Sequence, residues 1–346
     1  MASSPVRLSA LPRIRRIGFA VAGALAALAL AAPASAVAAP AAAKPKVIAT
    51  IPVGNNPIGV AVSPQTGNVY VADYVVLGKN VGGVSVISGK TNKVIRTFPT
   101  VHWVFGVAAS PRTGDIYVTS QAGKVLVISG KTSKVLRAIT VDGSLAGVAV
   151  SPLTGNVYVA SQGAKYEPGT VSVISGKTSK VLRTITVSIN PVAVAVSPRT
   201  GNIYVTNTIG STVTVISGRT NKVTASIPVR NDYPYWVAVS PRTGEIYTVN
   251  GSGNMSVISP RTNKITATIH VSSSMDPDAV AVSPRTGDIY VTNGDSNTVS
   301  VISPTTNKVT ATIRVGRGPL GVAVSPRTGY VYVTNSSGNT VSVIAG

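Results

Sequence analysis

The chain has 346 residues, no cysteine, only two histidines and a formal net charge of +21. Without cysteine it can form neither disulfides nor thiolate metal sites, and two histidines cannot complete a zinc site built from nitrogen and sulfur ligands. A chain of this size without disulfides must bury a large hydrophobic core to be stable. Its excess of positive charge favours anionic partners.

The first 36 residues have the composition of a secretory signal peptide. Four arginines precede an apolar Ala/Leu-rich stretch over residues 17–32, and a small-residue cleavage site ends at Ala36. The pattern predicts cleavage after Ala36, followed by an Ala/Pro-rich linker over residues 37–45. The mature protein is then expected to be secreted, at the cell surface or periplasmic. An uncleaved membrane anchor is the alternative, although the apolar run is shorter than the roughly 20 residues of a spanning helix.

A five-residue motif, Ser-Pro-x-Thr-Gly, recurs seven times along the rest of the chain at spacings of 41 to 47 residues. Its copies begin at Ser63, Ser110, Ser151, Ser197, Ser240, Ser283 and Ser325. Proline presets the backbone for a turn and glycine permits positive φ, so each copy is expected to join two strands. Repeats of this period are typical of propellers or solenoids.

Each repeat reads as four short strands. Residues 279–315, for example, contain AVAVSP, RTGDIYVTN, NTVSVIS and NKVTATIRV, which are runs rich in Val, Ile, Thr and Tyr bounded by turn residues. Helical spacing of apolar residues is absent from residues 46–346, which excludes a solenoid of helix pairs. The sequence therefore predicts an all-β fold, a seven-bladed β-propeller of four-stranded blades over residues 46–346.

The two ends of the repeat region complement each other. The chain finishes with NTVSVIAG, a third strand without a fourth, whereas residues 46–54 read as a fourth strand without the first three. We therefore expect residues 46–54 to form the outer strand of the last blade, pair with residues 340–344 and close the ring. An open array would more often show capped terminal repeats.

The repeats resemble those of the YVTN β-propeller family, which includes archaeal surface-layer proteins and YncE-like exported proteins. The letters YVTN follow SPRTG at residues 204–207, 290–293 and 332–335. Other copies depart from this pattern but keep its tyrosine, namely Tyr70, Tyr117, Tyr158 and Tyr247. We expect these tyrosines to pack between blades, each with a polar partner for its hydroxyl.

Connections in a propeller alternate between its two faces, so the first-to-second and third-to-fourth turns should share one face. Sixteen cations fall on these turns, against only Asp115, Glu245 and Asp288. The sixteen are Lys90, Lys93, Arg112, Lys131, Lys134, Lys177, Lys180, Arg199, Arg219, Lys222, Arg242, Arg261, Lys264, Arg285, Lys308 and Arg327. They predict a basic face that binds an anionic polymer, although repeated solvated turns would give the same pattern.

Eight of these cations are the candidate polyanion-binding residues. They are Lys131, Lys177, Arg199, Arg219, Arg242, Arg261, Arg285 and Arg327.

The opposite face should collect most of the remaining aromatic residues and seven carboxylates, including Asp73. Alignment of the repeats places several polar or aromatic residues just ahead of the innermost strands, where the mouth of the channel should lie. The candidate ligand-binding residues are His102, Trp103, Asn190, Tyr233, Tyr235, Trp236, Asp276, Asp278 and Arg317. They predict a site for a small molecule or a protein, with ordinary connections between blades as the alternative.

No catalytic residue, metal or cofactor follows from the sequence. Streptogramin lyases and sugar lactonases share a related architecture, but their catalytic signatures cannot be laid onto these residues. An enzyme using His102 with Asp276, Asp278 or Asp232 remains one alternative, and DNA binding through the basic face is another. The sequence favours a noncatalytic, exported binding or cell-surface protein, expected to be a monomer.

Overall fold

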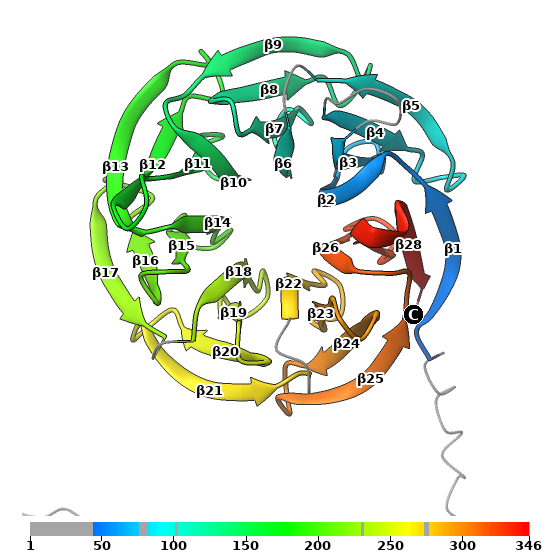
Figure 1. Cartoon of the computed structure of the whole chain (residues 1–346). Helices are drawn as coiled ribbons and strands as arrows, with labels where there is room; N and C mark the ends of the chain where they lie inside the picture. Colours follow the sequence, from blue (N-terminus) through cyan, green and yellow to red (C-terminus); the bar gives the residue numbers. More distant parts are fainter. Residues whose placement is uncertain (1–43, 76–81, 101–102, 230–231, 273–276, 346) are drawn as a thin grey trace, which may run out of the picture. The chain divides into compact units, whose positions relative to one another are not determined.

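The computed structural model describes residues 44–75, 82–100, 103–229, 232–272 and 277–345. Seven antiparallel sheets of four strands each form a ring around a central axis (Figure 1), which confirms the predicted seven-bladed propeller. Blades 1 to 6 are the sheets β2–β5, β6–β9, β10–β13, β14–β17, β18–β21 and β22–β25. Blade 7 consists of β26, β27, β28 and β1. None of the described helices is long and apolar enough to cross a membrane.

Each strand position within a blade has the same place in all seven sheets. The innermost strands are β2 (Asn55–Val62), β6 (Val104–Ala109), β10 (Ser144–Val150), β14 (Pro191–Val196), β18 (Pro234–Val239), β22 (Pro277–Val282) and β26 (Pro319–Val324). The second strands are β3 (Val69–Val75), β7 (Ile116–Ser120), β11 (Val157–Gln162), β15 (Ile203–Asn207), β19 (Ile246–Asn250), β23 (Ile289–Asn293) and β27 (Val331–Asn335).

The outer half of each blade is equally regular. The third strands are β4 (Gly83–Ile87), β8 (Lys124–Ile128), β12 (Pro168–Ile174), β16 (Thr212–Ile216), β20 (Asn254–Ser259), β24 (Thr298–Ser303) and β28 (Thr340–Ala345). The outermost strands are β5 (Val94–Pro99), β9 (Val135–Thr140), β13 (Val181–Ile189), β17 (Val223–Pro228), β21 (Lys264–His270), β25 (Lys308–Arg314) and β1 (Lys46–Pro52). A short 3-10 helix, η1 (Ser336–Gly338), joins β27 to β28.

The ring closes between the two ends of the repeat region. Strand β1 pairs antiparallel with β28, with Thr50 opposite Ser342 and Pro52 opposite Thr340. Just beyond β1, the Val53 backbone N–H donates to the Asn339 carbonyl at 3.0 Å. The predicted closure is therefore confirmed, and blade 7 is the only one of the seven sheets assembled from distant parts of the chain.

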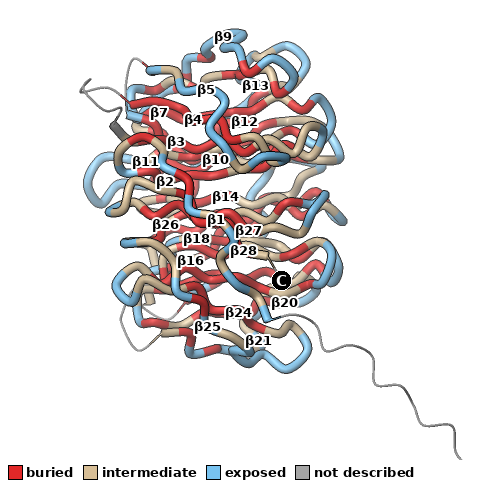
Figure 2. Tube along the Cα trace, turned by 90° about the vertical axis from the view of Figure 1, so that its right-hand side faces the viewer, coloured by how far each residue is buried: buried red, intermediate tan, exposed pale blue. Residues whose placement is uncertain are grey.

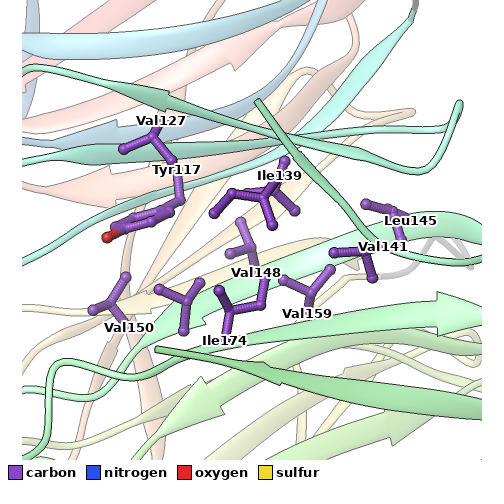
Figure 3. Packing of buried hydrophobic residues seen from close by; sticks show 11 residues of the cluster. Tyr117, Val127, Ile139, Val141, Leu145, Val148, Val150, Val159 and Ile174 are labelled. Carbon is purple, nitrogen blue, oxygen red and sulfur yellow. The ribbon is translucent and has the colours of Figure 1, made fainter. Parts of the chain in front are cut away.

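Burial falls from the second strand of each blade to the outermost strand (Figure 2). Strands such as β7, β15 and β23 are buried at every residue, because blades cover both of their faces, whereas β5 is exposed at most of its residues. The strand tyrosines pack between neighbouring blades as expected, but the buried Tyr204 hydroxyl lacks the expected hydrogen-bond partner among the described residues. Figure 3 shows Tyr117 of blade 2 against Val148 and Val150 of blade 3.

The threonine of the YVTN motif links neighbouring blades through a buried hydroxyl. In blade 4, the Thr206 hydroxyl accepts a hydrogen bond from the Ala193 N–H at 3.1 Å and donates to the Tyr235 carbonyl of blade 5 at 2.9 Å. The equivalent threonines of blades 2, 6 and 7 make the same pair of bonds. Each hydroxyl thereby satisfies backbone groups on two adjacent innermost strands, which buried backbone requires.

The last residue of the motif anchors the second strand to the third. In blades 4, 6 and 7 an asparagine amide donates to threonine or serine hydroxyls on the third strand, as Asn293 does to Ser300 at 3.0 Å. Blade 1 has Asp73 at this place, and Ser85 donates to its carboxylate at 2.6 Å. Asp73 is fully buried, so its predicted place among the surface carboxylates is wrong. Burial raises its pKa to about 7, although hydrogen bonds from Ser85 and the Gly54 backbone lower it.

We predict that Asp73→Asn stabilises the protein above neutral pH. Because the folded-state pKa lies above the unfolded value, protonated Asp73 supports folding at pH 4, and this support disappears as the pH rises through about 7. The shift corresponds to up to about 4 kcal/mol. Chemical denaturation should show Asp73→Asn more stable than wild type by about 2 to 4 kcal/mol at pH 8, with little difference at pH 4.

The matched control is Asn293→Asp, which places a buried carboxyl at the equivalent position of blade 6 and should introduce the same loss of stability with rising pH. If Asp73→Asn and wild type had parallel stability profiles between pH 4 and pH 8, the protonation of Asp73 would not contribute.

Candidate functional site

One face of the propeller carries both classes of turn on which the predicted cations lie. In blade 2, Gly130 of the third-to-fourth turn lies directly on Gly114 of the Ser-Pro-x-Thr-Gly turn, so close that a Cβ on Gly130 would meet the Gly114 carbonyl. The same contact joins Gly176 to Gly155 and Gly218 to Gly201. The two classes of turn therefore share one face, here called the basic face, and all sixteen predicted cations are exposed.

The arginines of the Ser-Pro-Arg-Thr-Gly turns hold neighbouring blades together. Arg199 donates from Nη1 to the Arg242 carbonyl at 2.6 Å, and Arg242 donates in turn to the Arg285 carbonyl at 2.7 Å. Further links run from Arg285 to Thr328 (3.1 Å), Arg327 to Gln65 (2.6 Å), Gln65 to Arg112 (3.2 Å) and Arg112 to Leu153 (3.0 Å). Six of the seven blade boundaries are bridged in this way.

The seventh boundary, between blades 3 and 4, has Leu153 where the other turns have arginine or glutamine. Leu153 is half exposed, and its side chain lies against Gly201 of the next turn without a hydrogen-bond donor. Four predicted polyanion-binding residues, Arg199, Arg242, Arg285 and Arg327, therefore already use one guanidinium nitrogen within the ring. Sequence reasoning missed this structural role, although the same residue position recurring in every repeat was the available signal.

The cations of the third-to-fourth turns project from the same face without such bridges. Four of the candidate polyanion-binding residues, Lys131, Lys177, Arg219 and Arg261, occupy these turns. Among the described residues, no carboxylate pairs with any of the sixteen cations. Glu245 instead accepts hydrogen bonds from the hydroxyls of Tyr247 (2.9 Å) and Thr243 (3.2 Å). The positive charge of this face is therefore not neutralised internally.

On the opposite face, the predicted aromatic residues lie at separate places. Trp103 stacks on Tyr74 with ring centroids 5.3 Å apart near the boundary of blades 1 and 2. Tyr233 and Tyr235 are exposed beside β18 of blade 5. Asn190 lies between β13 and β14, where its carbonyl accepts a hydrogen bond from the Thr208 N–H at 2.9 Å. The structure therefore does not gather these residues into one pocket.

Trp236 lies near the centre of the ring. Its ring lies 6.5 Å from that of Phe105, which comes from β6 on the other side of the ring (Figure 1). Trp236 also packs against the hydrophobic clusters of the neighbouring blades, and it borders a narrow central cavity of about 100 Å³ with Val60 and Val194. This space is too small for a drug-sized ligand, for which sites of about 300 Å³ or more are typical.

Two predicted ligand-binding residues do come together. Asp278 and Arg317 line a polar cleft of about 410 Å³ between blades 6 and 7, with Asp295, Asn297 and Ser337. Carboxylates, a guanidinium and hydroxyls in one cleft can hydrogen-bond to a small polar molecule that carries both signs of charge.

His102 and Asp276 lie outside the described residues, so the distance between this histidine and any carboxylate is not defined. Asp232 accepts a hydrogen bond from the Ser252 N–H at 3.0 Å. In the described ranges, no three His, Cys, Asp or Glu side chains are grouped closely enough to hold a metal ion.

Comparison with known proteins supports the fold and goes no further. No protein-family model and no curated protein matches the chain, so the resemblance to the YVTN family is not confirmed. Among solved structures the chain is similar to one titled Kuenenia stuttgartiensis hydrazine synthase, with a TM-score of 0.73 and 18% sequence identity. The match covers 84% of this chain and 96% of that chain. Identity at this level shows a shared fold and not a shared activity.

We predict that Leu153→Arg completes the series of bridges by donating to the Arg199 carbonyl. Because a net intramolecular hydrogen bond contributes about 1 kcal/mol, the variant should gain about that much in free energy of unfolding, measured by urea denaturation. Leu153→Met is the control, since methionine has similar length without a donor. Equal stability of the two variants would show that the bridges do not stabilise the ring.

Proposed function

We propose that this protein is an exported, noncatalytic binding propeller of the YVTN type that holds an anionic polymer against its basic face. The observation that carries the proposal is the set of sixteen exposed cations on the basic face. Only three carboxylates lie on the same face, and the cations form no ion pair with a described residue. Export rests on the signal-like residues 1–36, and the family rests on the repeated motifs.

The cations are presented on backbone of fixed shape. In the turn of blade 2, the Ser129 N–H donates to the Lys134 carbonyl at 2.9 Å and the Ser133 N–H donates to the Ser129 carbonyl at 2.8 Å. The turns of blades 1, 3 and 4 repeat both bonds. Lys131 and its counterparts therefore recur at the same place in each of blades 1 to 5. A polymer can contact several of them at once, whereas a small anion contacts one or two.

Selectivity among anionic polymers is expected to be low. Contacts between cations and phosphate give affinity without sequence information, and the released counterions make binding steeply dependent on salt. Proteins that bind single strands add exposed aromatic rings to their cations, whereas Tyr330 is the one aromatic residue in the described turns of this face and is only partly exposed. Net charge and spacing should therefore govern binding.

We predict that the triple charge reversal Lys131→Glu, Lys177→Glu, Arg219→Glu weakens binding to a labelled 20-base-pair DNA duplex, used as a defined polyanion. The slope of log affinity against log salt should fall by about 2 to 3, because each lost phosphate contact removes about 0.9. Two duplexes of unrelated sequence should bind equally well. Fluorescence anisotropy between 20 and 300 mM salt measures all of these quantities.

The matched control is Lys165→Glu, Arg314→Glu, Arg317→Glu, which reverses three exposed cations that lie away from the basic face. Both triples change the net charge by the same amount. If they weakened binding equally, the overall charge and not the basic face would be responsible, and the proposed interface would be wrong.

A further inference from the structure

Blade 7 lacks the third-to-fourth turn that every other blade has. Its third strand, β28, ends at Ala345 and its fourth strand, β1, begins at Lys46, so no turn joins them. At the other boundaries such a turn covers the tyrosine of the preceding blade. Six of the strand tyrosines are at most 1% exposed, whereas Tyr290, which faces blade 7, is 8% exposed.

The covering turns make a recurring set of contacts with the preceding blade. Their fifth residue is a serine or asparagine in the left-handed conformation, such as Ser133 (φ 52°) or Asn221 (φ 53°). Ser133 is hydrogen-bonded to the Tyr70 hydroxyl at 3.0 Å, and Asn221 accepts from the Tyr158 hydroxyl at 3.1 Å. At a third boundary Ser179 is hydrogen-bonded to Arg137 at 2.7 Å.

The place of the absent turn in blade 7 is a cavity of about 760 Å³. Its walls include Asp288, Tyr290 and Ala311 of blade 6, Gly329 of blade 7, and Lys44 and Pro45 just before β1. Gly329 corresponds to Gly114 and Gly155, on which the third-to-fourth turns of blades 2 and 3 lie. Ala311 is opposite Val301, as Arg137 is opposite Val127 in blade 2, so blade 6 has a small side chain where blade 2 has an arginine.

We propose that this cavity, here called the seam pocket, binds a tight turn of a partner protein with the chemistry of the turns found in the other blades. That chemistry is the sequence Ser-Gly-Lys-Thr-Asn/Ser-Lys of the turns in blades 1 to 3. This inference goes beyond polymer binding and does not depend on it, because the seam pocket takes a cationic peptide and not a polyanion.

Each feature of such a turn has a counterpart in the seam pocket. A left-handed asparagine or serine meets the Tyr290 hydroxyl, as Asn221 and Ser133 meet Tyr158 and Tyr70. A glycine at the second position fits closely over the backbone of Gly329, as Gly130 does over Gly114. Asp288, one of the few carboxylates of the basic face, lines the seam pocket together with Arg285 and Lys44. The resulting contacts would complete blade 7.

The test is the binding of a cyclic peptide that contains Ser-Gly-Lys-Thr-Asn-Lys, the sequence of residues 88–93, to the full chain by isothermal titration calorimetry. Tyr290→Phe removes one hydrogen bond and should weaken binding roughly fivefold. Ala311→Arg should strengthen binding roughly fivefold, because the arginines at this position in blades 2 and 3 donate hydrogen bonds to the covering turn, as Arg137 does to Ser179 at 2.7 Å. A cyclic peptide of the same composition in scrambled order should bind at least tenfold more weakly.

Two variants at boundaries that are already covered serve as controls. Tyr158→Phe lies under the blade 4 turn and Ala225→Arg lies at the boundary of blades 4 and 5, and peptide affinity should stay within twofold of wild type in both. Circular dichroism and thermal unfolding establish that all four variants are folded.

Three results would overturn the proposal. The first is no binding of the cyclic peptide to wild type at millimolar concentration, and the second is equal binding by Ala311→Arg and wild type. The third is binding that appears only after residues 1–43 are removed, which would assign the seam pocket to the preceding part of the same chain. Because the peptide is cationic, none of these results bears on polyanion binding, so the two proposals fail separately.

Discussion

The structure depends on burying the second strand of each blade between two neighbouring blades. A single four-stranded blade leaves this strand's apolar faces and its motif tyrosine open to water, so each blade needs the next one to complete its core. The burial is specific because polar groups cross the same boundaries. Thr206 and its counterparts join adjacent innermost strands, and Tyr70 and Tyr158 reach the turn of the following blade. Side-chain volume and hydrogen bonding therefore both fix the spacing between blades.

The arginines of the basic face serve structure and charge together. Arg242 donates one hydrogen bond to the neighbouring turn, yet it keeps its full charge and its other donors at the surface. Such a residue supports the ring and contributes to the electrostatic potential of the face at the same time. The cations of the third-to-fourth turns make no such bridges, and blade 6 has Thr305 where blade 2 has Lys131.

The fold was predictable because repetition and strand periodicity are properties of the sequence alone. Seven copies of one turn motif gave the number of blades, and the unmatched end strands gave the closure. The positions of individual side chains were harder to predict from the sequence than the fold. Asp73 follows a motif tyrosine by three residues as Asn207 does, which indicated its position but not its full burial. Trp236 lies near Phe105, and Asp278 lines the same cleft as Arg317. The two residues of each pair come from different blades, and the spacing of residues within one repeat does not predict distances between blades.

The pairing of β1 with β28 bears on how the chain reaches its native state. Thr50 and Ser342 are partners although almost the whole chain lies between them, and contacts of such long sequence separation form slowly because loop closure opposes them. During synthesis β1 has no partner until the final strand emerges, so its edge stays available for mispairing. The pairing of β28 with β1 therefore decides when the ring can close.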